Sequence, residues 1–287
     1  MKEVLPTTIT TPDELYASKS ALILERYFGL TMPDWKKRLP RTIIERLVDY
    51  FAYPLYVKGI ENLDATQNLI MERKKIVMLS NHLSWADPPV TMAALKRNGF
   101  EEMAEMTTII AGIKLHTDPV RNLLGAAYDV IPIWSPFTEP KNQEEKEIRF
   151  EMHKKALIKT EQTLETGRPL LTYPEATRSR TQELVVGRPE ITHYLARDLT
   201  KVENTFVVPT GIYGTEKILP VGALLPDVNS ATVVFGEPIE VAMVVKMFKY
   251  SPRETRRQLI MNYFMYRIAD CLPEKYHGVY AKTYAQT

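Results

Sequence analysis

The sequence has 287 residues but only one cysteine, Cys271, and almost no net charge. A single thiol can form neither an intramolecular disulfide nor a thiolate metal cluster, so a disulfide-stabilised scaffold and a structural zinc site are both excluded. The 37 Lys and Arg residues nearly balance the 35 Asp and Glu residues, and the formal net charge is +2. Since no global positive field indicates nucleic acid as a partner, we expect none.

Long apolar runs are missing as well. Charged side chains interrupt every apolar stretch well before the roughly 18 residues that a bilayer crossing needs. The first part of the chain has no continuous apolar segment and includes acidic side chains, which is typical of neither a secretory signal nor a transit peptide. Because the low cysteine content is also typical of a reducing compartment, we expect a cytoplasmic protein that is soluble or peripheral on a membrane.

The composition is that of an ordinary folded protein, with 45% hydrophobic and 25% charged residues. Such values exclude the class of disordered chains, which combine low hydrophobicity with high net charge. Neither a repeat nor a low-complexity tract nor a Gly/Ser-rich linker divides the sequence. We therefore expect an N-terminal helical extension over residues 1–54 and one α/β domain over residues 55–287.

From residue 55 onward, short apolar runs alternate with longer amphipathic segments. This alternation is typical of an α/β fold in which helices cross over between strands, and we expect a mixed, largely parallel sheet flanked by helices. The expected strands are LYVKGI, KIVMLS, TTIIA, DVIPI, PLLTY, TFVVPTGIY and ATVVFG. The expected helices span residues 88–97, 119–126, 143–166, 189–197 and 252–272.

Apolar residues at helical spacing predict which faces of three segments are buried. In residues 21–53, which we expect to form an amphipathic helical pair, the apolar stripe comprises Ile43, Ile44, Leu47, Val48 and Phe51. In residues 143–166 it comprises Phe150, Leu157 and Leu164. Near the C-terminus it comprises Ile260, Phe264, Ile268 and Cys271, of which Cys271 is expected to be a small buried apolar side chain.

The segment KIVMLSNHLSWADPP contains the first group of polar side chains that could take part in a reaction. An expected strand ends near Leu79, His82 follows in a polar turn, and Asp87 directly precedes a proline. Asp is favoured as a helix N-cap and proline in the first helical turn. We therefore expect Asp87 at the start of a helix that follows the carboxyl end of a strand, which is where α/β sheets bind ligands.

Two interpretations fit this spacing. In the first, the chain between His82 and Asp87 loops, so that the carboxylate holds one imidazole nitrogen and leaves the other to act as a base. In the second, Asp87 only caps the helix and His82 lies in the loop without a joint role.

A second strand-to-turn segment is PLLTYPEATRSR. Its apolar run ends at Tyr173 and is followed by the polar candidates Glu175, Thr177, Arg178 and Arg180. Arginines and hydroxyl groups at the edge of a sheet can bind a phosphate through charge-assisted hydrogen bonds. The alternative interpretation is a solvated turn with surface arginines.

Together the two segments resemble the glycerol-3-phosphate and 1-acylglycerol-3-phosphate acyltransferase family. Asn81-His82, four residues and Asp87-Pro88 resemble its His-x4-Asp box, and Tyr173 to Ser179 resembles its Phe-Pro-Glu-Gly-Thr-Arg-Ser box. Three weaker blocks follow the same order as in the family, namely GAAYDVIPI, VVPTGIYG and the closing LPEKYHGVY. The resemblance covers roughly residues 55–240.

The resemblance implies an acyltransferase that moves a fatty acyl group from acyl-CoA or acyl-carrier protein to the hydroxyl of glycerol-3-phosphate or its 1-acyl derivative. It implies that His82 is the general base and that Asp87 orients it. Backbone N–H groups near the turn are candidates for stabilising the oxyanion. Glu175 and Arg178 would belong to the acceptor site, with Thr177 and Arg180 as further phosphate ligands. We expect no metal and no cofactor other than the thioester co-substrate.

The chain departs from the family pattern at two positions. Ala176 stands where the family usually has glycine, and Tyr173 stands where it has phenylalanine. These departures leave open a tailoring acyltransferase that uses another alcohol or an amine. A non-catalytic acyl-carrier or lipid-binding protein is a further alternative, as is a thioesterase-like hydrolase, although the sequence lacks the Gly-x-Ser-x-Gly elbow of ordinary serine hydrolases.

The remaining histidines are weaker candidates for chemistry. We expect His153 and His193 on the surface and a structural role for His277. His116 is the one rival base, because Asp118 lies two residues away.

Residues 33–53 combine basic side chains with Trp35 and the apolar stripe described above. Such a segment can lie on an anionic membrane surface. Alternatively, its stripe packs on the domain.

Overall fold

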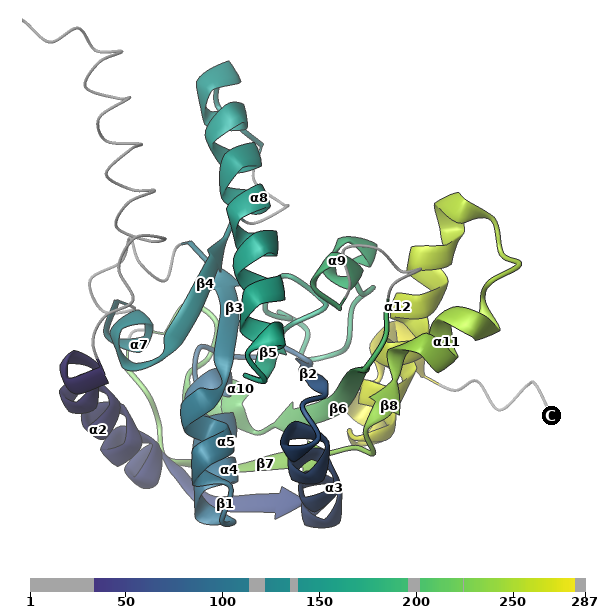
Figure 1. The fold of residues 1–287 in the computed structure, drawn as a ribbon. Helices are drawn as coiled ribbons and strands as arrows, with labels where there is room; N and C mark the ends of the chain where they lie inside the picture. The colour runs from purple at the N-terminus through teal and green to yellow at the C-terminus, as the bar shows by residue number, and fades with distance from the viewer. Residues whose placement is uncertain (1–33, 114–121, 135–138, 196–201, 224, 282–287) are drawn as a thin grey trace, which may run out of the picture.

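The fold is built on an eight-stranded sheet, seen in a computed structural model that describes residues 34–113, 122–134, 139–195, 202–223 and 225–281 (Figure 1). The strand order is β1-β7-β6-β2-β5-β3-β4, and β8 pairs with β6. The strands are β1 (Ala52–Lys58), β2 (Lys75–Ser80), β3 (Thr108–Gly112), β4 (Asp129–Ile133), β5 (Leu170–Thr172), β6 (Thr205–Tyr213), β7 (Asn229–Phe235) and β8 (Ile239–Glu240).

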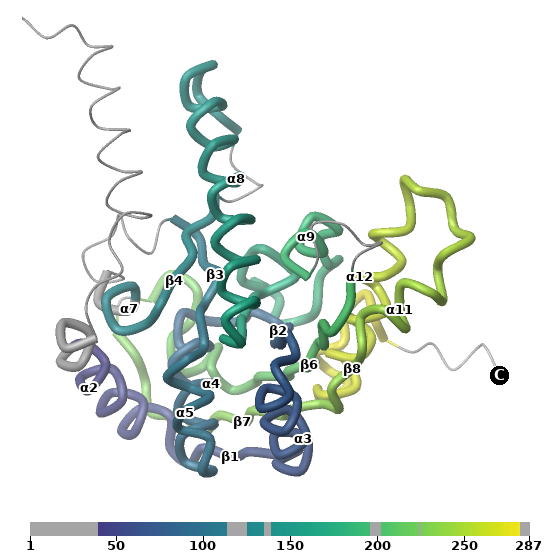
Figure 2. Tube along the Cα trace, viewed as in Figure 1, coloured from purple at the N-terminus to yellow at the C-terminus, as the bar shows by residue number. Residues whose placement is uncertain are grey.

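The sheet is mixed and largely parallel, as predicted. Strands β6, β2, β5, β3 and β4 run parallel to one another, whereas β7 and β8 pair antiparallel with β6. Strand β1 pairs parallel with β7, although the two lie far apart in the sequence (Figure 2). The start of β1 therefore lies at the same end of the sheet as the carboxyl ends of β2 and β6.

Helices cover both faces of the sheet. One face carries α8 (Gln143–Glu165), α9 (Thr192–Leu195), α11 (Val241–Met247) and α12 (Arg253–Asp270). The other carries α2 (Asp34–Phe51), α3 (Ile60–Met71), α4 (Asp87–Arg97), α5 (Glu101–Met106), α7 (Asn122–Ala127) and α10 (Thr215–Ile218). In β2, Val77 and Leu79 join the first core and Ile76 and Met78 the second, because successive strand residues face opposite sides. This two-sided burial explains why the strand is almost purely apolar.

All seven expected strands are present, and the expected helices match α4, α7, α8, α9 and α12 within a few residues. Residues 119–121 and 196–197 of the expected helices lie outside the described part of the chain. The sequence did not indicate β8, α3, α5, α10 or α11. Four of these five elements have two to seven residues, which is too short for a periodic pattern to stand out.

The predicted stripe of α8 is wrong at Phe150, whose side chain is 67% exposed. The buried side chains are Met152, Ala156, Thr160 and Thr163, with Leu164 in the last turn. Phe150 lies two residues before Met152 and thus about 200° away around the helix, on the opposite face. The N-terminal part of α8 also extends beyond the sheet (Figure 1).

The other two stripes are only partly buried. In α2, Ile44 and Val48 are buried, but Ile43 and Leu47 are exposed. In α12, Ile260, Phe264 and Ile268 are fully buried. Cys271 is half-buried at the end of α12, and burial raises the pKa of its thiol to about 12.

Helix α2 is one helix of the pair expected in residues 21–53, and it packs on α7, α4 and β1. The rest of that segment up to residue 33 lies outside the described residues. Strand β1 begins at Ala52 and so crosses the boundary predicted at residue 54, and the division into an extension and a domain stays a prediction. No helix within the described ranges has the length and apolar character that crossing a bilayer would take.

Candidate active site

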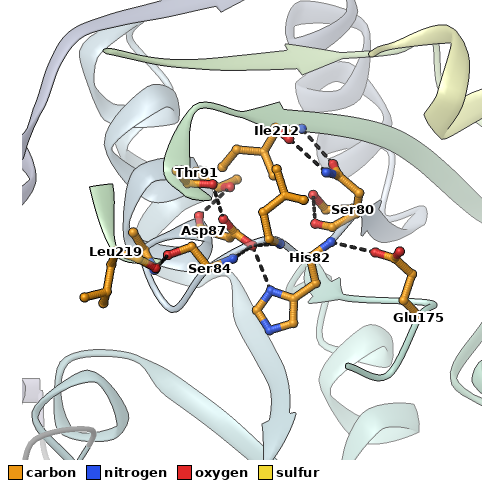
Figure 3. Close-up of polar contacts among 12 residues, drawn as sticks. Ser80, His82, Ser84, Asp87, Thr91, Glu175, Ile212 and Leu219 are labelled. Carbon is orange, nitrogen blue, oxygen red and sulfur yellow. Dashed lines mark hydrogen bonds and ion pairs between the residues drawn. The ribbon is translucent and has the colours of Figure 1, made fainter. Parts of the chain in front are cut away.

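His82 and Asp87 lie at the carboxyl end of β2, in the turn that leads into α4 (Figure 3). Strand β2 is flanked by β5 and β6, which places the turn near the middle of the sheet. Helix α4 begins at Asp87 with two prolines in its first turn, and Ala86 occupies the cap position. The strand, turn and helix thus follow the predicted order, with Asp87 one position inside the helix instead of at its N-cap.

The turn brings His82 and Asp87 into direct contact. The imidazole Nδ1 lies 2.8 Å from Asp87 Oδ2. The same oxygen accepts the backbone N–H groups of Leu83 at 2.6 Å and Ser84 at 2.9 Å, and Thr215 Oγ1 donates to Oδ1 at 2.5 Å. The carboxylate is 0% exposed, and its Oδ2 already accepts two backbone N–H groups, so the His82 tautomer that fits this contact carries its proton on Nδ1. Nε2 then points away from Asp87 (Figure 3).

Two aromatic rings contact the imidazole of His82. The ring of Tyr173 stacks on it, with centroids 4.2 Å apart and an interplanar angle of 23°. Trp85 meets it edge to face, with centroids 6.4 Å apart. The guanidinium carbon of Arg178 lies 4.6 Å from the centroid of the Trp85 ring. Tyr173, from the second polar segment, therefore contacts His82, the candidate general base in the first segment.

The hydroxyl that Tyr173 adds to the family pattern is buried and has no hydrogen-bond partner among the described residues. Burial, together with the charge of Asp87, holds the pKa of Tyr173 well above its usual value. The tyrosine consequently stays neutral and contacts His82 through its ring.

Glu175 ties the two segments together through backbone amides. Its Oε2 accepts the N–H of His82 at 2.8 Å and its Oε1 accepts that of Val185 at 3.0 Å. A backbone bond from Ser179 N to His82 O, 2.7 Å long, adds a second connection. Glu175 is buried, whereas Arg178 is half-buried and Thr177 and Arg180 are exposed. Glu175, one of the four predicted acceptor ligands, thus uses both carboxylate oxygens to accept the backbone N–H groups that hold the turn.

These bonds leave few amides of the turn for an oxyanion. The N–H groups of His82, Leu83 and Ser84 donate to Glu175 and Asp87, and that of Ala86 donates to Ser84 Oγ. The expectation that turn amides stabilise the oxyanion is therefore not supported at these four positions.

The buried carboxyl of Glu175 predicts a pH-dependent stability. Burial raises its pKa to about 8, aided by the charge of Asp87 and opposed by the amides of Val185 and His82. Between the unfolded pKa of about 4.3 and pH 8, the folded state holds a proton that the unfolded chain has lost, so stability falls as the pH rises. We expect the free energy of unfolding to fall by about 1 kcal/mol per pH unit from pH 5 to 8, measured by urea denaturation.

In Glu175→Gln, which cannot titrate, this dependence should be much weaker. Glu183→Gln, a change at an exposed glutamate of the same loop, serves as the control and should keep the wild-type slope. Equal slopes in all three proteins would contradict the burial argument.

Ala176 adopts a left-handed conformation, with φ at 55°, which is the geometry that favours glycine. A Cβ at this φ costs about 1 kcal/mol. We therefore expect Ala176→Gly to raise the free energy of unfolding by about 1 kcal/mol. The same change at Ala93, a buried residue of α4, should lower it by a similar amount because helices disfavour glycine. If both changes lower the melting temperature, the positive φ of residue 176 does not lower the free energy of unfolding as expected.

The structural roles of several residues in the site were not predicted from the sequence. Asn81 locks the turn to β6 with two 2.8 Å bonds, from its Nδ2 to Ile212 O and from Ile212 N to its Oδ1. Thr215 supports Asp87 from α10, directly after a left-handed Gly214. Gly214, directly after an expected strand, is a signal from which a turn here could have been predicted.

The C-terminal block LPEKYHGVY also supports the site. Tyr276 OH donates to Glu216 Oε1 at 2.8 Å, and Tyr280 OH accepts the N–H of Gly187 at 3.0 Å. A backbone bond joins Leu184 N to Tyr276 O. The tail therefore fixes the loop that contains Val185 and, through it, Glu175.

The other histidines lie apart from this arrangement. His153 is exposed and His193 is half-buried, close to the predicted surface positions. His277 Nε2 bonds Leu272 O at 2.9 Å, which agrees with a structural role. His116 and Asp118 lie outside the described residues. No group of three or more His, Cys, Asp or Glu side chains that could hold a metal occurs in the part of the chain that the structure describes.

Comparisons with known proteins bear on the fold and the family. A search of curated protein sequences finds no match. Among solved structures, the 1-acyl-sn-glycerophosphate (LPA) acyltransferase PlsC from Thermotoga maritima has a similar fold, with a TM-score of 0.50, 17% identity and 88% of each chain covered. A sequence model of the acyltransferase family matches residues 55–213, more than half of the chain and the whole of both polar segments. This protein belongs to the acyltransferase family.

Proposed function

We propose that the protein transfers a fatty acyl group from a thioester donor to the hydroxyl of a phosphorylated glycerol acceptor. The single observation that carries the proposal is the contact between His82 Nδ1 and the buried, four-times-bonded carboxylate of Asp87. An imidazole oriented in this way is a ready-made base for an alcohol, and such bases typically accelerate reactions about 10²- to 10⁴-fold. The name of the similar structure supports the acceptor class.

In the proposed reaction, the acceptor hydroxyl binds to Nε2 of His82 and gives up its proton as its oxygen attacks the thioester carbonyl. The tetrahedral intermediate collapses with cleavage of the C–S bond, and the imidazolium returns the proton to the leaving thiolate. The products are an ester and a free thiol. The carboxylate of Asp87 stabilises the transient imidazolium and keeps it in place. No acyl-enzyme is needed because a thioester is already activated.

The acceptor's phosphate is assigned to Arg178, with the exposed Thr177 and Arg180 beside it. A guanidinium presents a planar set of donors that matches phosphate geometry. Arg178 lies over Trp85, whose ring contacts that of His82. A hydroxyl close to the phosphate within one molecule can therefore reach both groups.

A panel of substrates tests the proposal. Purified protein is given acyl-CoA or acyl-carrier protein together with glycerol-3-phosphate, 1-acylglycerol-3-phosphate, unphosphorylated glycerol or ethanolamine. Thiol release and the acylated product are measured. We expect acylation of a phosphorylated acceptor with a kcat/KM at least about tenfold above that of glycerol. Preference for glycerol or the amine would instead indicate the tailoring acyltransferase, and thiol release without acylated product would indicate a hydrolase.

We further propose that α2 and the adjoining loop contact a membrane surface. Exposed apolar side chains on α2 and at the start of β1 are Ile43, Leu47, Tyr50 and Tyr53, and Val228 and Leu225 are exposed in the loop before β7. Ala52 pairs with Asn229, so that these two segments are neighbours. They lie at the end of the sheet that also holds His82, where an enzyme of lipids would meet its substrates.

This contact predicts that Leu47→Glu weakens binding to anionic vesicles about tenfold, through lost apolar burial and charge repulsion. Cosedimentation with phosphatidylglycerol vesicles measures the effect, and binding of the wild type should fall with added salt. Met71→Glu is the matched control, because Met71 is also exposed but ends α3 at the opposite end of the sheet. Equal binding of both variants would contradict the contact.

A further inference from the structure

Trp85 joins the two polar segments of the site, although it belongs to neither candidate set. It lies in the turn between His82 and Asp87, and its half-buried ring contacts both His82 and Arg178. The His82 imidazole meets it at a centroid distance of 6.4 Å and an interplanar angle of 88°. The guanidinium carbon of Arg178 lies 4.6 Å from its centroid.

A guanidinium within about 6 Å of an indole face is attracted by the negative face of the ring. Arginine has many rotatable bonds, and this attraction adds a restraint on the positions that its side chain can sample. Because Trp85 also contacts His82, the attraction restricts Arg178 to the neighbourhood of the base. The distance between the bound phosphate and the reacting hydroxyl is thereby restricted as well.

We propose that Trp85 is a positioning residue that holds Arg178 at a fixed distance from His82, and so selects acceptors whose hydroxyl lies near an anionic group. This inference rests on the proposed function. It goes beyond that function by assigning the geometry of acceptor selection to one aromatic side chain. In this proposal His82, and not Trp85, contacts the reacting atoms.

The backbone around Trp85 supports the assignment. Its neighbours on both sides are fixed, because Ser84 N bonds Asp87 and Ala86 N bonds Ser84 Oγ. Ser84 Oγ in turn donates to Leu219 O at 2.8 Å. The indole therefore projects from a turn that is already held by hydrogen bonds. It can contact Arg178 without any further ordering of the backbone.

The test compares Trp85→Leu, Trp85→Phe and Arg178→Ala, each checked for folding by circular dichroism. We expect Trp85→Leu to raise the KM for the phosphorylated acceptor about 3- to 30-fold, with less than a twofold change in kcat. Trp85→Phe keeps a ring face and should recover most of the lost affinity. A residue needed only for folding would lower activity in all respects and would not separate KM from kcat in this way.

The double variant Trp85→Leu/Arg178→Ala gives the decisive comparison, because residues that act as a unit are not additive. If Trp85 acts through Arg178, its loss should have no further effect on KM once Arg178 is absent. Trp134→Leu is the matched control. Trp134 carries Arg149 at 4.5 Å in an equivalent contact, but it follows β4, three strands from β2. Its acceptor KM should match that of the wild type.

Each contrary result has a distinct meaning. An unchanged KM in Trp85→Leu, or an equal further loss in the Arg178→Ala background, overturns the positioning role while the proposed function stands. An unchanged KM in Arg178→Ala overturns both the phosphate assignment and the positioning role. If the wild type acylates none of the acceptors, calorimetric titration with glycerol-3-phosphate gives Kd in place of KM. Absence of binding there overturns the inference too.

Discussion

Replacing His82 by alanine is expected to lower kcat for acyl transfer by about 10³-fold. The change removes Nε2, the nitrogen proposed to accept the hydroxyl proton, while the bonds of Asp87 to Leu83, Ser84 and Thr215 remain. The acceptor KM should change little, because the imidazole contacts the hydroxyl and not the phosphate. Thiol release at saturating acceptor measures the effect.

Two controls accompany this variant. His153→Ala removes an exposed histidine of α8 and should leave kcat unchanged. Added imidazole should restore part of the activity of His82→Ala, since the small molecule can occupy the vacated position. Turnover of His82→Ala at the wild-type rate would exclude His82 as the base and with it the proposed mechanism.

Replacing Asp87 by asparagine is expected to affect both catalysis and stability. The buried carboxylate accepts four hydrogen bonds. In asparagine an NH2 group replaces one of the two oxygens, so that on that side a donor faces the donors of the site. The proton is then no longer held on Nδ1 of His82, so that kcat should fall about 10²- to 10⁴-fold. Unpaired buried donors should lower the free energy of unfolding by about 1–3 kcal/mol.

Further variants separate the contributions to this effect. Thr215→Val removes the bond to Oδ1 alone and should cost roughly tenfold in kcat, whereas Thr215→Ser keeps the donor and should resemble the wild type. The double variant His82→Ala/Asp87→Asn should be no slower than His82→Ala, because the two residues act as a unit. A multiplicative loss in the double variant would show that Asp87 acts independently of His82.

The contact between His82 and Asp87 was one of two interpretations that the sequence left open. The structure shows the contact, with three groups of the same turn converging on the carboxylate, and the role of His82 as a base stays a proposal. The residues involved are only three to five positions apart. Such local contacts depend on the turn alone, and this is why the spacing could suggest them.

Prediction of the strands succeeded for a similar reason. The apolar run KIVMLS indicates that β2 is buried on both faces, because a strand with one solvated face would alternate apolar and polar residues. Prediction of the α8 stripe failed at Phe150, because spacing alone does not show which face of a helix packs on the sheet. The same limit applies to Ile43 and Leu47 of α2, which have the spacing of buried residues but are exposed.

The sequence by itself determined seven of the eight described strands, where the polar turns fall and which side chains are available for acid–base chemistry. Only the tertiary structure decided how those side chains are used. Thr215 reaches Asp87 across 128 residues and Glu175 reaches the amide of His82 across 93, and Arg178 reaches Trp85 from a different strand end. Contacts of this kind form only when β2, β5 and β6 pair side by side, and no local pattern encodes the order in which strands pair.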